Sequence, residues 1–176
     1  MNIKGINGAV ADVTDAGFLK TTTIAQTLEQ VLAIEGKRFY VSLIETPTGA
    51  GDAFFYLKNT GTSDLGLGFV VASSDVDTTE IAASVVTGDA SAGTPIEAIN
   101  LNLGSTNTLD ATILHAPAIT GLTDQLTFGA LQLTVANTAY AVGAAGELLV
   151  PQGKAVVMRR LGATGTIKLS LNVGVL

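Results

Sequence analysis

The single histidine, His115, is the side chain best suited to acid–base chemistry, and it lies in the stretch LDATILHAPA. A hydrolytic triad would use His115 as the base, an acid such as Asp110 or Asp124 to orient it, and a nucleophile. The Gly-x-Ser-x-Gly turn that carries the serine of many hydrolases does not accompany it. His115 follows an alternating pattern and comes just before Pro117. We therefore predict a structural histidine at a strand end rather than a catalytic one.

Three carboxylates, Asp75, Asp77 and Glu80, lie close together in SSDVDTTE. Paired carboxylates can hydrolyse glycosides, and a set of carboxylate oxygens can bind calcium. The loop glycine and the twelfth-position glutamate of an EF-hand are absent. We interpret the stretch as a solvent-exposed acidic loop, and calcium binding is the alternative.

Two glycine-containing stretches, GLGFVV and GATGTIK, miss the spacings that bind dinucleotides and phosphates. Both are better interpreted as strand and turn. We thus assign no catalytic, cofactor-binding or metal-binding residue. We expect no cofactor, and we predict that the chain is not an enzyme.

The charges are divided along the chain. All nine Lys and Arg lie in 1–58 or 154–176, while the segment 59–153 has Asp and Glu but no Lys or Arg. This division predicts either a solvated acidic face or subunits that meet through opposite potentials. A basic cluster on the last hairpin could bind carboxylates of a neighbouring subunit or form an exposed basic edge. Its members are Lys154, Arg159, Arg160 and Lys168.

The overall composition favours a protein with covered surfaces. Of the 176 residues only 14% are charged, against about 25% in typical domains. The net charge of −6 argues against nucleic acid as a partner. The absence of cysteine excludes disulfides and thiolate sites, and fits synthesis in a reducing cytoplasm. No signal-peptide core or run of about 18 apolar residues is present, so we expect neither secretion nor a membrane partner.

Strand-like alternation dominates the sequence. In DAFFYLKNTGTSDLGLGFVVAS (52–73) it places Ala53, Phe55 and Leu57 on one face and Phe54 and Tyr56 on the other, before a polar turn. Phe54 and Tyr56 are then either contact anchors or residues buried by a second layer. Further strands are predicted at 39–46, 79–87, 94–104, 109–113, 126–135, 146–150, 155–160 and 167–175.

This pattern predicts an all-β fold, an antiparallel, jelly-roll-like β-sandwich with at most one short helix. Residues 1–20 are expected to form an irregular N-terminal arm that orders only against a neighbour, and 21–176 a single sandwich domain. The segment 23–36, TIAQTLEQVLAIEG, suits either a helix capped by Gly36 or a hairpin that turns at Glu35-Gly36. We favour the hairpin because the remainder is β.

Two segments carry a resemblance to a known group of proteins. They are GDAFFYLKNTGTSDLGLGFV (51–70) and ELLVPQGKAVVMRRLGATGTIKLSLNVGVL (147–176), together under a third of the chain. In them the chain resembles small virion proteins of tailed bacteriophages, particularly head decoration (cement) proteins with a jelly-roll fold. Neither segment is a diagnostic motif, and no functional residue carries over.

The resemblance implies a virion protein on the capsid exterior, made in the host cytoplasm, that ties neighbouring capsomers together. It implies two partners, the major capsid protein and further copies of this chain in a homotrimer. A clamp of this kind needs repeated apolar and backbone contacts rather than a catalytic centre. The alternatives are another phage part (tail, fibre-base or minor capsid protein) and a carbohydrate-binding sandwich, which the absence of Trp disfavours.

Overall fold

The computed structural model describes residues 2–4, 10–13, 19–22, 27–142 and 148–176. The chain divides into two units, Met1–Val31 and Leu32–Leu176. In the first unit, β1 (Asn2–Lys4), β2 (Val10–Val13) and β3 (Leu19–Thr22) form an antiparallel sheet in the order β1-β2-β3. Part of the predicted irregular arm is thus strand. Its dependence on a neighbour stays a prediction.

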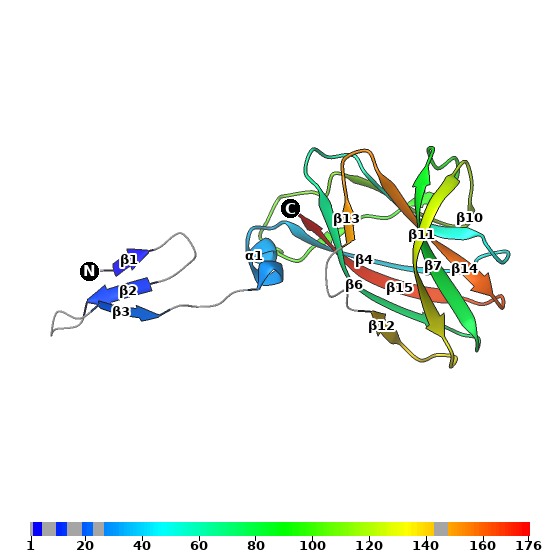
Figure 1. The fold of residues 1–176 in the computed structure, drawn as a ribbon, viewed down its shortest axis with the longest axis horizontal. Coiled ribbons are helices and arrows are strands. Elements are labelled where there is room, and N and C mark those ends of the chain that lie inside the picture. Colours follow the sequence, from blue (N-terminus) through cyan, green and yellow to red (C-terminus); the bar gives the residue numbers. More distant parts are fainter. Residues whose placement is uncertain (1, 5–9, 14–18, 23–26, 143–147) are drawn as a thin grey trace. The chain divides into compact units, whose positions relative to one another are not determined.

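The second unit is a sandwich of two antiparallel sheets (Figure 1). One sheet has the order β11-β7-β14-β5-β10-β8, and the other has the order β12-β6-β15-β4-β9, with β13 also paired to β6. The strands are β4 (Arg38–Glu45), β5 (Ala53–Asn59), β6 (Leu65–Ser74), β7 (Thr79–Thr87), β8 (Thr94–Pro95), β9 (Ile99–Asn100), β10 (Ala111–Ile119), β11 (Thr123–Leu133), β12 (Tyr140–Val142), β13 (Leu148–Val150), β14 (Ala155–Gly162) and β15 (Ile167–Val175).

The strand order is that of a jelly roll. When β8–β10 are treated as an insertion and β12 and β13 as one interrupted strand along β6, eight strands remain. We number these strands 1 to 8 along the chain, in the sequence β4, β5, β6, β7, β11, β12 with β13, β14 and β15. One sheet then has the order 1-8-3-6 and the other the order 2-7-4-5, which are two interlocked Greek keys. The predicted all-β, jelly-roll-like sandwich is therefore confirmed. The insertion lengthens both sheets, because β9 joins β4 and β10 joins β5.

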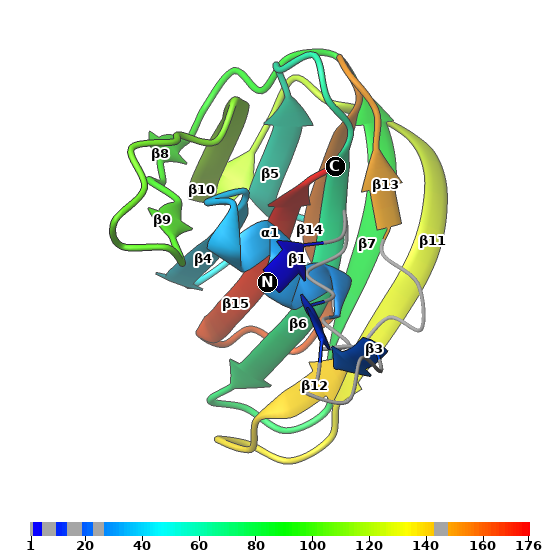
Figure 2. The same cartoon turned by 90° about the vertical axis from the view of Figure 1, so that its left-hand side faces the viewer.

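The core lies between the two sheets. β15 contributes Ile167, Leu169, Leu171 and Val173, all buried, as its predicted alternation requires. Figure 2 shows β15 between β4 and β6, in front of the layer that contains β5, β14 and β7. A second, smaller cluster covers the outer face of β5, where loop residues such as Leu122 pack over Tyr56.

The predicted faces of β5 are partly wrong. Phe54 and Phe55 both join the core, whereas Ala53 and Tyr56 lie in the second cluster. The reason is that the pairing of β5 with both neighbours shifts register next to Ala53, which breaks the period-two alternation there. Because Phe54 and Tyr56 are buried, neither is an exposed contact anchor.

The hairpin predicted within 23–36 is wrong, since this segment contains the helix α1 (Leu28–Ile34). Thr27 and Gln30 form a reciprocal capping box, with hydrogen bonds of 3.0 and 3.2 Å. At the other end Gly36 has φ +67, and the N–H of Lys37 donates to the carbonyl of Leu32 at 2.8 Å. This is a Schellman cap, so the local cap signals outweigh the β character of the rest of the chain. Within the described residues, no helix has the length and hydrophobicity to cross a membrane.

Two further strand predictions needed correction. The strand predicted at 94–104 is reduced to β8 and β9. After β9 the side-chain oxygens of Asn100 and Asn102 accept the N–H groups of Asn102 and Gly104, which a strand would pair with a neighbour. The strand predicted at 109–113 is instead β10, which continues through Pro117 to Ile119. Of 146–150, the structure describes Leu148–Val150 as β13, and 146–147 lie outside the described residues.

We predict that Gly36→Ala lowers the free energy of unfolding by about 2 kcal/mol, because a left-handed backbone costs a non-glycine residue about 1–2 kcal/mol and the new Cβ adds a collision. That Cβ would lie 2.2 Å from Ser105 Oγ. Urea unfolding measures the change. The control is Gly104→Ala, where φ is not positive and the nearest atom is 3.5 Å away, so stability should hardly change. Equal losses in both variants would contradict the cap.

Candidate functional site

His115 lies inside β10 rather than at a strand end, and its partner is neither of the predicted acids. Its Nδ1 is 2.8 Å from Oε2 of Glu45, at the end of β4 in the other sheet. Asp124 binds Arg159 instead, and the carbonyl of Asp110 accepts hydrogen bonds at the β5–β6 turn. Both the imidazole and the carboxylate are largely buried. The pair joins the two sheets near one edge of the sandwich.

A carboxylate on Nδ1 is the arrangement that orients a catalytic imidazole. A nucleophile on the other ring nitrogen is also required. Within the described part of the chain, no serine or threonine hydroxyl is hydrogen-bonded to His115. Among the described residues the geometry therefore supplies an orienting pair alone, and this pair joins β10 to β4.

The acidic stretch after β6 ties together parts of the chain that are distant in sequence. Oδ1 of Asp75 accepts the N–H of Thr166 at 2.7 Å, and Oδ1 of Asp77 accepts the N–H of Ala136 at 2.6 Å. Glu80 lies apart from them on β7. Among the described residues, no group of three or more His, Cys, Asp or Glu side chains could hold a metal ion. Asp75 and Asp77 are exposed, as predicted, and they stabilise turns.

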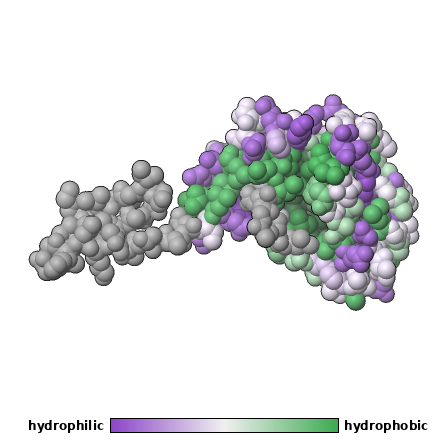
Figure 3. Space-filling model, in the orientation of Figure 1, coloured by the Kyte–Doolittle hydropathy of each residue, from purple (hydrophilic) through white to green (hydrophobic). Residues whose placement is uncertain are grey.

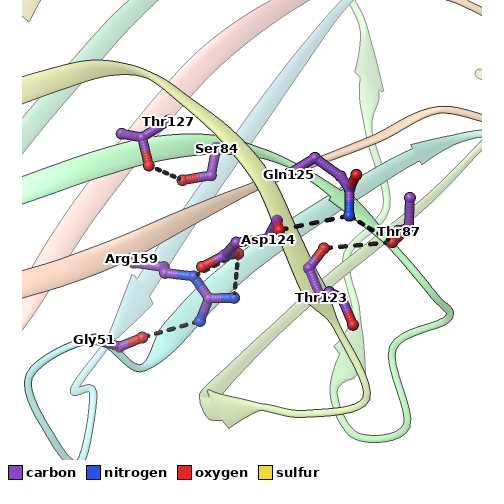
Figure 4. Close-up of polar contacts among 8 residues, drawn as sticks. All are labelled: Gly51, Ser84, Thr87, Thr123, Asp124, Gln125, Thr127 and Arg159. Atoms are coloured by element: carbon purple, nitrogen blue, oxygen red, sulfur yellow. Dashed lines mark hydrogen bonds and ion pairs between the residues drawn. The ribbon is translucent and has the colours of Figure 1, made fainter.

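Arg159 is bound within its own chain (Figure 4). Its Nε and Nη2 donate to Oδ1 of Asp124 at 3.2 and 2.7 Å, and its Nη1 donates to the carbonyl of Gly51 at 2.9 Å. Beside this pair the hydroxyls of Ser84 and Thr127 join β7 to β11 at 3.0 Å. Of the two alternatives for Arg159, a carboxylate on a neighbouring subunit or an exposed basic edge, neither is needed, because the acidic middle of the same chain supplies the carboxylate.

Arg160 points the opposite way, into the sandwich. It follows Val156 and Met158 on the core-facing side of β14 and is fully buried. Nη1 donates to the carbonyl of Ala163 at 2.8 Å, but Nε and Nη2 have no partner in the described residues. Buried guanidinium nitrogens without partners are costly. The predicted basic cluster therefore does not form: Arg159 and Arg160 are on opposite faces, and Lys168 is exposed on the other sheet.

Tyr56 and Lys58 lie on the outer face of β5, beside the 88–93 loop. Burial raises the pKa of Tyr56 above its ordinary value of 10.0; Lys58 opposes this shift and the charge of Asp89 adds to it. The ammonium of Lys58 donates to Oδ1 of Asp89 at 2.5 Å, and this hydrogen bond raises the pKa of Lys58. A basic residue from the start of the chain again meets an acid from its middle.

Several exposed apolar side chains lie around the loop at 100–107, which is hydrogen-bonded to the end of α1. Ile34, Ile99, Leu101 and Leu103, which we call the leucine patch, have exposed fractions of 63, 57, 44 and 90%. Figure 3 shows hydrophobic surface gathered near α1. Sequence reasoning assigned Leu101 and Leu103 to a strand and so missed this patch. The asparagines between these residues were the available signal, because asparagine favours turns.

Three asparagine side chains hold the loop under the leucine patch. The amide groups of Asn100, Asn102 and Asn107 donate to the carbonyls of residues 34–36 at the end of α1, at 2.9–3.3 Å. The N–H of Leu101 donates to the carbonyl of Arg38 at 2.9 Å. The orphan carbonyls of the helix end are thereby satisfied, and the loop is fixed by the same bonds.

We predict that the free energy of unfolding falls as the pH rises above 10, because the pKa of Tyr56 is raised in the folded state. Between the unfolded and the folded pKa of Tyr56, the native state keeps a proton that the unfolded state has lost, so the free energy of unfolding falls as pH rises. Tyr56→Phe should reduce this loss. Urea unfolding from pH 8 to 11 measures it, with Asp89→Asn as the control for the lysine contribution. The same alkaline slope in Tyr56→Phe would contradict the assignment.

The two adjacent arginines give a matched pair of substitutions. Arg160→Met should leave the free energy of unfolding unchanged or raise it by about 1 kcal/mol, because buried charges are often replaced favourably by apolar groups. The substitution removes the hydrogen bond from Arg160 to the carbonyl of Ala163, but that carbonyl still accepts the hydroxyl of Thr79. Arg159→Met should lower stability by about 1 kcal/mol, since it breaks a partly exposed ion pair and a backbone hydrogen bond. A larger loss for Arg160→Met than for Arg159→Met would show that Arg160 has a partner beyond the described residues.

Comparison with known proteins gives little further information. No family model matches the chain, and no curated protein matches it. Among solved structures, the subviral particle of infectious bursal disease virus VP2 aligns with this chain at 11% identity and a TM-score of 0.13. The alignment covers 97% of this chain and 47% of the VP2 chain. This chain thus spans about half the length of that one. At this TM-score the likeness carries no argument about fold or function.

Proposed function

We propose that this chain is a structural virion protein, most specifically a capsid decoration protein that binds the head exterior and stabilises contacts between capsomers. The observation that carries the proposal is the leucine patch, a group of large apolar side chains held outside the core. Its partners in this proposal are the major capsid protein and further copies of the chain in a trimer.

The exposure of the patch supports a protein partner. Isolated exposed leucines are common on protein surfaces, but four large aliphatic side chains around one loop form the kind of feature that marks an interface. Leu103, at 90% exposed, contributes almost nothing to the stability of the sandwich. Burying it against another protein would stabilise the complex by about 1.5–3 kcal/mol.

The rigidity of the loop supports the same role. A binding loop that is disordered when free must be ordered on binding, which weakens the complex. Here the asparagine side chains have already bound the loop to the end of α1. Repeated by symmetry over a shell, even a small preformed contact of this type would give strong overall attachment.

The arrangement of the polar side chains fits a binding role better than a catalytic one. The candidate catalytic and metal-binding residues tie separate elements to each other: His115 to Glu45, Asp124 to Arg159, and Asp75 to the turn before β15. A scaffold tied in this way supports a clamp under load. A tail, fibre-base or minor capsid protein would use the same features, and these roles differ only in which surface the patch contacts.

We predict that Leu103→Asp weakens binding to undecorated capsid shells by at least about tenfold, because a central apolar contact in an interface is typically worth more than 1.4 kcal/mol. The measurement is co-sedimentation of the labelled chain with undecorated shells of its proposed partner, the major capsid protein. The matched control is Leu126→Asp, since Leu126 is another exposed leucine, at 63%, but lies on β11.

Both variants should unfold at the wild-type urea midpoint, so that lost binding reflects the surface alone. If wild type does not bind the shells, the decoration role is wrong. If binding is equally weak in both variants, the leucine patch is not the contact. Calcium-dependent binding on a glycan array would instead support the carbohydrate-binding alternative and would direct attention back to Asp75, Asp77 and Glu80.

A further inference from the structure

A second feature, separate from the leucine patch, is a large hollow inside the sandwich. It has a volume of about 490 Å³ and lies between the sheets on the side of β11 and β13. Its walls include Ala72, Ala83, Gly129, Leu131 and Leu148. A hollow with hydrophobic surface is visible on the face shown in Figure 3. None of the lining residues that the structure describes is charged.

The hollow results from small residues at paired positions. In the first sheet, Phe55, Met158, Ala83 and Gly129 lie opposite one another on β5, β14, β7 and β11. The side chains in this row shrink from a phenyl ring to a hydrogen atom as it approaches the edge strand β11. A Cβ added at Gly129 would meet no atom within 4 Å. The sequence thus leaves room where a packed core would have aliphatic side chains.

The hollow is open to solvent on one side, but the space that it leaves between the sheets is unusually large. Protein interiors are packed about as closely as organic crystals, with few voids larger than one water molecule. Water is a poor occupant here because it needs two to four polar partners, and the walls are apolar. The volume is within the range of small-molecule sites, about 300–1,000 Å³.

We propose that this hollow is a binding site for an unbranched, uncharged alkyl chain, such as the hydrocarbon part of a long-chain alcohol or ester. The walls supply dispersion contacts and no charge to pair with a head group. Strands β6, β7, β11 and β13, which build most of the walls, come from the segment 59–153, which has no Lys or Arg. This segment disfavours an anionic head at the opening, so a neutral ligand fits best. The proposal does not depend on the virion role proposed above.

The test uses Nile red, a neutral dye whose emission rises in apolar sites, and n-alkanols as competitors. The full chain should bind the dye saturably, and alkanols should displace it. Between hexanol and dodecanol each added methylene should strengthen displacement about fourfold, as expected for burial of a CH₂ group. Dodecanoate should compete at least about tenfold less well than dodecanol, since its charge has no partner in the walls.

Ala83→Leu should fill part of the hollow, weaken dodecanol binding by at least about tenfold and raise the thermal unfolding midpoint. The control is Ala92→Leu, the same change in an exposed loop, which should alter neither. Gly129→Val is a second filling variant, in case Ala83→Leu fails to fold. The proposal is overturned if the dye does not bind saturably, if hexanol and dodecanol compete equally, or if filling leaves binding unchanged. It is also overturned if sedimentation shows an oligomer that Ala83→Leu dissociates, because a second copy would then occupy the hollow.

Discussion

Burial of apolar side chains between the two sheets is the interaction on which every other feature depends. A large side chain such as Phe55 or Leu169, fully removed from water, stabilises the fold by about 1.5–3 kcal/mol. If β5 or β15 slipped by one residue along its neighbours, these side chains would turn outward. The core therefore fixes the register of both sheets. Register in turn places His115 opposite Glu45 and brings Arg159 to Asp124.

Polar side chains mark the limits of this core and hold its edges. Part of the division of charge along the chain is used internally, since Lys58 and Arg159, from the basic ends, bind Asp89 and Asp124, from the acidic middle. The leucine patch adds apolar surface on a loop fixed by asparagines. In the function proposed above, low charge, structural use of the acids and this preformed patch belong together, as features of a rigid body that would act by contact.

Alternation and turn residues were enough to predict most of the sheets, because β15 carries a complete period-two pattern and β14 lies between the turn residues 151–153 and 162–165. The hairpin was favoured over the helix because the Gly36 cap is a local signal that we weighed below the β character of the whole chain, and because the capping box at Thr27 was not recognised. The partner of His115 could not be predicted, since Glu45 is 70 residues away and meets it only because the inserted strand β10 pairs with β5, across the sandwich from β4. The hollow was equally hidden, because Ala83 and Gly129 become informative only once they are paired.

Amide hydrogen exchange of the free protein tests most directly whether it is a rigid body that presents a preformed surface. The account predicts that the amides of β5, β6, β14 and β15 exchange together and slowly, through one global opening. It also predicts that the amide of Leu101, bonded to the carbonyl of Arg38, is protected with them. Exchange of the 100–107 loop at the rate of an unstructured peptide, or separate opening of the two sheets, would contradict it.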